Sequence, residues 1–218
     1  MERHFDHDLA ELKGKLLTMA SHAEKAVGDS VTALVNRDLN LALQVKANDE
    51  ILDRFEMEID ETAITLLARA PLASDLRLVT VAMKISQNLE RAGDEATKIA
   101  KRARDLCNEP PLKLALALPQ MSTLALGLLK SSLDAFVNRD SSAARGLIPR
   151  DKQVNALHKE MQQQLIAHMK ENPDYIARCL HFLVAAKSLE RIADHATNIA
   201  EEVVYLYEAT DIRHADKA

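Results

Sequence analysis

Two pairs of carboxylates lie four residues apart in two nearly identical stretches of the sequence. Glu90 and Asp94 form the first pair, and Glu190 and Asp194 form the second. On a helix, residues at this spacing lie on one face, one turn above the other. Like charges so placed are mildly destabilising, so their presence in both stretches asks for a reason. Two such carboxylates can hold a hard cation or form the edge of a larger cluster.

A second region in each half of the chain can supply further oxygen ligands. Asp49 and Asp53 have the same spacing, and their counterparts are Asp151 and Asn155, where an amide replaces one carboxylate. Counting along the apolar pattern places Glu90 and Glu190 next to the buried seam, and Asp94 and Asp194 further outward. We therefore expect these carboxylates to face solvent and not the core. The sequence therefore predicts that any metal site is an open patch on the surface.

Other interpretations of these residues stay open. Acidic pairs are common on solvated helix faces, and Arg54, Arg91 and Arg191 could neutralise them. Di-iron carboxylate bundles need Glu-x-x-His facing the core, and none of the eight His residues follows a Glu at that spacing. A ferritin-like oxidase is therefore disfavoured. His195, beside Asp194, could be a ligand, but we interpret it as a surface or helix-packing residue. His4 and His7 are interpreted as part of a solvated terminal turn.

The elements that carry these residues are predicted to be long helices. Apolar residues make up 47% of the chain but aromatic residues only 3%, and 5 Gly with 6 Pro are too few for many short strands. Over 78–106 and again over 182–206, apolar residues recur at alternating spacings of three and four, which is a heptad seam. Turn signals near 36–38, 70–71, 108–111, 138–140 and 172–174 divide the chain into six long segments. Their short connections predict antiparallel neighbours.

The chain is also an internal duplication. Residues 35–38 recur at 137–140, an offset of 102, and eight of the twelve residues in 89–100 recur at 189–200, an offset of 100. The change of offset indicates a two-residue deletion between the second and third segments of a repeat. The predicted fold is all-α, with two tandem, similar three-helix bundles, and the predicted domains are 1–108 and 109–218.

Composition and missing motifs exclude several functions. The 28 basic and 33 acidic residues give a net charge of −5 without a long basic run, which disfavours nucleic acid as a partner. No apolar stretch approaches the ~20 residues of a membrane helix, and the polar start does not resemble a signal peptide. Cys107 and Cys179 are far apart and predict buried thiols in a reducing compartment. No phosphate loop or nucleophile motif is found. We expect a soluble cytoplasmic protein without enzymatic activity.

The repeated segments resemble the signature of the PhoU family. The similarity is carried by ERAGDEATKIA at 90–100 and ERIADHATNIA at 190–200, and covers nearly the whole chain. It is supported by 71–77 and 172–175, which precede the two signature segments, and by 4–6 and 201–206 near the ends. The resemblance implies two three-helix bundles acting as a negative regulator of bacterial phosphate homeostasis. The implied partners are the ATPase subunit of the phosphate ABC transporter, a sensor histidine kinase and a second copy in a homodimer.

The same resemblance implies surface metal ions or a multinuclear cluster, of Fe or of Mg, Ca, Mn or Zn, without fixing which. The implied ligands are Asp49, Asp53, Glu90, Asp94, Asp151, Asn155, Glu190 and Asp194. Three positions depart from the family pattern: Ala193 replaces a glycine, Glu95 replaces a histidine, and Asn155 removes a negative charge. We therefore expect the first repeat to be the better cation site. Two alternatives remain: a metal-handling bundle or carboxylate-metal enzyme, and a structural coiled-coil dimerisation module.

Overall fold

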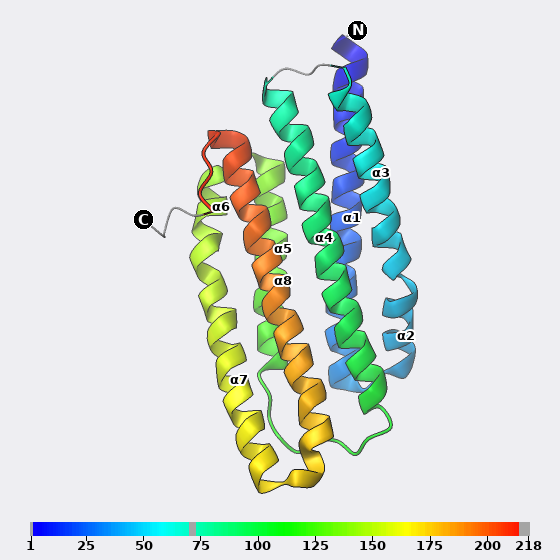
Figure 1. The fold of residues 1–218 in the computed structure, drawn as a ribbon, viewed down its shortest axis with the longest axis vertical. Coiled ribbons are helices and arrows are strands. Elements are labelled where there is room, and N and C mark those ends of the chain that lie inside the picture. The colour runs from blue at the N-terminus through cyan, green and yellow to red at the C-terminus, as the bar shows by residue number, and fades with distance from the viewer. Residues whose placement is uncertain (1, 70–72, 214–218) are drawn as a thin grey trace.

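The computed structural model describes residues 2–69 and 73–213, and every regular element in these ranges is helical (Figure 1). The elements are α1 (Glu2–Asn36), α2 (Leu39–Ala47), α3 (Asp49–Leu67), α4 (Ala73–Leu106), α5 (Leu118–Asn138), α6 (Ser141–Leu147), the 3-10 turn η1 (Ile148–Arg150), α7 (Asp151–Glu171), η2 (Pro173–Tyr175) and α8 (Ile176–Glu208). The predicted all-α class is confirmed. The predicted turn at 70–71 lies outside the described residues. No helix in the described ranges has the length and hydropathy needed to cross a membrane.

The layout of six helical segments holds, with one break inside the second segment of each repeat. Asn48 separates α2 from α3. In the second repeat, η1 separates α6 from α7 and contains Pro149. The α-helix is interrupted there because a proline has no N–H to continue the helical hydrogen bonds. Asp38 and Asp140 begin these segments in the same way, each accepting a hydrogen bond from the backbone three residues on, at 3.0 and 2.8 Å.

The duplication extends to the backbone conformation of the turns. Arg37 and Arg139, which are 102 residues apart, both adopt the left-handed conformation, with φ of 56° and 57°. Residues 107–117 connect the two repeats between α4 and α5. The predicted division at 108 and 109 falls in this connection and stays a prediction.

The core is built around the two longest seams. In α4 and α8 the predicted seam residues are buried, apart from the half-buried Phe182 at the start of the second seam. The two helices pack against each other in the middle of the molecule, with α1 and α3 beside α4 and with α5 and α7 beside α8 (Figure 1). Each repeat therefore contributes its third helix to one shared core.

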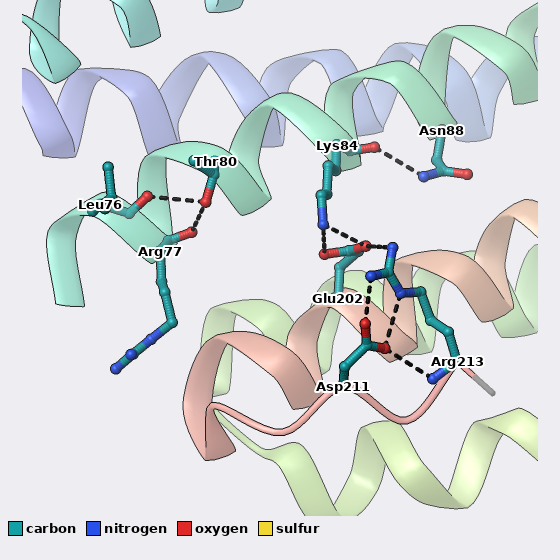
Figure 2. Close-up of polar contacts among 8 residues, drawn as sticks. All are labelled: Leu76, Arg77, Thr80, Lys84, Asn88, Glu202, Asp211 and Arg213. Carbon is teal, nitrogen blue, oxygen red and sulfur yellow. Dashed lines mark hydrogen bonds and ion pairs between the residues drawn. The ribbon is translucent and has the colours of Figure 1, made fainter. Parts of the chain in front are cut away.

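Polar contacts tie the two repeats together along the α4–α8 seam. The buried Glu95 of α4 accepts hydrogen bonds from Lys98 at 2.8 Å and, across the seam, from Arg191 at 3.1 Å. Further along, the buried Glu202 of α8 lies 3.0 Å from Lys84 of α4. Arg213, beyond the end of α8, approaches the same carboxylate at 3.6 Å (Figure 2). The two carboxylates hold the repeats in one orientation.

Candidate metal centres on the two repeats

The first predicted cluster lies where α3 packs beside α4. Asp49 and Asp53 come from α3, and Glu90 and Asp94 come from α4. The charge of Asp94 raises the pKa of both Asp49 and Glu90, so the four predicted carboxylates share one electrostatic environment. Glu56 of α3 belongs to the same group, because it interacts with Glu90, Asp53 and Asp94. The structure therefore brings together the four predicted residues of this repeat and adds a fifth.

Burial and mutual repulsion destabilise the negative charges of this cluster. Burial, followed by the charge of Asp94, raises the pKa of Glu90 to about 7, against the lowering effect of Arg91. Burial also raises the pKa of Glu56, to which Asp60 adds, and that of Asp49, which a hydrogen bond from Thr97 partly offsets. A bound cation would relieve this repulsion, since opposite charge favours the ionised carboxylates.

The prediction that the carboxylates face solvent is wrong for two of the residues. The side chains of Glu90 and Glu190 are each only 15% exposed, whereas Asp94 is 40% exposed and Asp53 is exposed. The neighbouring α3 and α7 pack along α4 and α8 and cover the glutamates. Each cluster thus lies at the edge of a helix-helix contact.

Gly93 leaves room for the side chain of Leu52 where α3 packs against α4 at the first cluster. A Cβ at this position would lie 2.2 Å from Cδ1 of the buried Leu52. Gly93 and Leu52 each directly precede a predicted ligand, Asp94 and Asp53. At the equivalent positions the second repeat has an alanine and a smaller partner, Ala193 and Val154, both fully buried.

The second cluster occupies the equivalent place between α7 and α8. Burial, followed by the charges of Glu190 and Asp151, raises the pKa of Asp194 to about 6. Asn155 donates a hydrogen bond to Asp151 at 3.3 Å, and its Oδ1 atom is buried without a hydrogen-bond partner. Lys187 forms an ion pair with Glu190. The four predicted residues are again brought together, but a lysine already neutralises one of them.

One further residue in each cluster escaped the sequence analysis. Glu56 lies seven residues after Asp49, on the same face of α3, and the offset of 102 makes His158 its counterpart. His158 is half-buried on α7 and interacts with the charge of Glu190. Burial lowers its pKa, which favours the neutral imidazole that binds metals. Extending the duplication by one turn beyond Asp53 and Asn155 would have found both residues.

The donor chemistry of both clusters fits cations. The first offers five carboxylates, and the second offers three carboxylates, the unpartnered amide oxygen of Asn155 and the imidazole of His158. Carboxylate and amide oxygens suit Mg²⁺, Ca²⁺ and Mn²⁺, and imidazole suits Zn²⁺ and iron. The donor atoms of these two clusters lie further apart than the ligand atoms around one bound ion. Binding therefore requires the side chains to rotate toward one another.

A third group comes closer together on α1. In the part of the chain that is described, only His7, Asp8 and Glu11 place three ligand atoms within 4.8 Å of one another. Asp8 already forms an ion pair with Arg69, and Glu11 lies 3.2 Å from Lys15. These cations compensate the acidic charge of the group without a metal ion. His195 lies 3.0 Å from Asn88 across the α4–α8 seam and acts in helix packing.

The sequence of this chain is similar to those of known proteins. The sequence model of the PhoU domain matches residues 16–103 and 118–203, one match in each repeat. The chain is 40% identical over 216 residues to the phosphate-specific transport system accessory protein PhoU homolog of Pseudomonas putida, covering 98% of this chain and 84% of the relative. It is 42% identical over 204 residues to the homolog of Rhizobium meliloti, covering 93% and 86%.

Solved structures agree with the sequence comparison. The crystal structure of PhoU from Pseudomonas aeruginosa has a TM-score of 0.92 at 39% identity, covering 94% of this chain and all of that one. The phosphate transport system regulatory protein PhoU from Streptococcus pneumoniae has a TM-score of 0.89 at 30% identity, covering 95% and 99%. Because these relatives are named as accessory and regulatory proteins, the prediction that the chain is not an enzyme is confirmed. The chain belongs to the PhoU family.

Proposed function

We propose that this chain is a cytoplasmic negative regulator of phosphate homeostasis. It contacts the ATPase subunit of the phosphate ABC transporter and a sensor histidine kinase, and restrains phosphate uptake and starvation gene expression when phosphate is ample. The observation that carries the proposal is the PhoU match in both repeats, together with accessory proteins of phosphate-specific transport that align with 98% of the chain.

The packing of the two repeats supports a mechanism based on contact. A regulator that touches two partners needs surfaces held at a fixed distance and orientation. The shared α4–α8 core and the interrepeat contacts of Glu95 and Glu202 supply that rigidity. The chain acts as a homodimer in this proposal and presents its acidic helix faces to the partners.

Cations bound at the two acidic clusters belong to the same proposal. Asp49, Asp53, Glu56, Glu90 and Asp94 would hold one ion or cluster, and Asp151, Asn155, His158, Glu190 and Asp194 the other. A bound cation supplies positive charge that brings the flanking helices of each repeat together. The raised pKa of Glu90 and the unpartnered Oδ1 of Asn155 support this role.

A metal-handling bundle is the second candidate function. The two clusters of ligand-type side chains favour it independently of the family. Metal accumulation that depends on the protein while phosphate regulation is unchanged would distinguish it from the regulator.

Deletion of the gene tests the proposed function. Alkaline phosphatase, a product of phosphate starvation genes, should be high in the deletion strain in phosphate-rich medium and return to low activity with the wild-type gene. Unchanged low activity in the deletion strain would refute the negative regulatory role. A strain carrying Gly127→Ala serves as a conservative surface control, since a Cβ at this exposed position meets nothing within 4 Å.

A further inference from the structure

The two clusters occupy equivalent positions but offer different donor atoms. Asp49, Glu90 and Asp94 have carboxylate counterparts in the second repeat, namely Asp151, Glu190 and Asp194. The remaining two positions differ, because Asp53 corresponds to Asn155 and Glu56 corresponds to His158. The first repeat thus has oxygen donors alone, and the second combines a nitrogen donor with fewer negative charges.

We propose that the two repeats select different cations and that His158 determines the choice in the second. The second cluster takes a borderline divalent ion such as Zn²⁺, and the first takes a hard ion such as Mn²⁺ or Mg²⁺. This inference rests on the proposed binding of cations at these clusters. Imidazole favours Zn²⁺ strongly over Mn²⁺, whereas a carboxylate set discriminates between them less and suits hard ions.

The surroundings of His158 support a ligand role. It lies on α7 seven residues after Asp151 and three after Asn155, so the three side chains share a helix face. The half-buried ring interacts with the charge of Glu190, which comes from α8. The buried Oδ1 of Asn155, which has no hydrogen-bond partner, supplies a second neutral donor at the same place.

Lys187 distinguishes the two clusters further. Its ammonium group forms an ion pair with Glu190, whereas the equivalent residue of the first repeat is the uncharged Gln87. A cation entering the second cluster has to displace this lysine. Weakly held hard ions are therefore excluded more effectively than a Zn²⁺ ion that gains a bond to nitrogen.

A pair of exchanged variants tests the inference on the full-length, metal-free protein. His158→Glu gives the second repeat the donor of the first, and Glu56→His makes the reverse exchange. Each protein is dialysed against equal concentrations of Zn²⁺ and Mn²⁺, and bound metal is measured by mass spectrometry. Co²⁺ absorption and histidine nuclear magnetic resonance shifts report whether an imidazole is a ligand.

The wild-type chain should bind Zn²⁺ with histidine ligation, and His158→Glu should weaken Zn²⁺ binding by at least about 10-fold, since loss of even an outer-shell partner of a metal ligand costs about 10–100-fold. Glu56→His should raise the Zn²⁺ preference of the first repeat. Zn²⁺ binding that survives His158→Glu with unchanged affinity and histidine signals would overturn this inference alone. Failure of the wild-type chain to bind any metal would overturn it together with the proposed cation role, while leaving the regulatory role to the deletion test.

Discussion

Replacing Gly93 with alanine tests the contact that positions α3 against α4 beside the first cluster. The added Cβ would lie 2.2 Å from Leu52 Cδ1, and Leu52 is only 2% exposed, so its side chain must shift within a packed core. Overpacking of this kind costs about 1–3 kcal/mol, and the better helix propensity of alanine returns up to about 1 kcal/mol. We expect the free energy of unfolding to fall by up to about 2 kcal/mol, which lowers Tm by up to roughly 8 °C for a chain of this size.

Thermal and urea unfolding in the presence of a chelator measure this effect without a contribution from metal binding. Leu52→Val alone should lower the free energy of unfolding by about 1 kcal/mol, because it leaves a cavity. Combined with Gly93→Ala, it recreates the Val154 and Ala193 pair of the second repeat. The double variant should therefore be more stable than Gly93→Ala. Gly127→Ala is the control, because its Cβ has open space. A Gly93→Ala protein as stable as the control, or strictly additive effects in the double variant, would refute the reasoning.

Three further predictions concern the charged groups. Glu90→Ala with Asp94→Ala should remove more bound metal than Glu190→Ala with Asp194→Ala, as judged by metal analysis, because the first cluster has more carboxylates; equal losses would contradict this. Since the pKa of Glu90 is about 7 when folded and 4.5 ordinarily, the folded state binds more protons between these values, so the stability of the metal-free protein should fall as pH rises from 4.5 to 7. Glu90→Gln should flatten that fall in urea titrations, and an unchanged slope would count against the raised pKa. Lys84→Met should lower the free energy of unfolding in urea by about 2 kcal/mol, because it leaves the buried Glu202 without its closer partner. Arg213→Ala removes a more distant, exposed partner of the same carboxylate and should cost less than about 1 kcal/mol. Equal costs would contradict this ordering.

The helical architecture could be predicted from the sequence because it depends on local periodicity. The three-and-four spacing of the α4 and α8 seams and the repeated Asp38 and Asp140 caps are visible in one chain. The breaks at Asn48 and η1 were missed, since a turn inside an otherwise helical segment is set by how the flanking helices pack. Pro149 was a signal for the second break.

The candidate sites were predicted less completely than the fold. Spacing alone identified the carboxylates at i and i+4, but Glu56 and His158 lie another turn along, and their relevance depends on which face α3 and α7 present to α4 and α8. The burial of Glu90 depends on the packing of α3 along α4, which no local sequence pattern shows. The contact of Lys84 with Glu202 joins residues 118 positions apart, and no local pattern predicts it.

The most direct test of the regulatory proposal is binding of the purified, full-length chain to its two proposed partners. The ATPase subunit of the host's phosphate transporter and the cytoplasmic part of its phosphate sensor kinase are each immobilised, and equilibrium binding is measured with Gly127→Ala as a conservative surface control. We expect saturable binding to both partners at micromolar concentrations or below. Binding to neither partner, with the chain folded and dimeric, would contradict the proposal that it acts by contact between transporter and kinase.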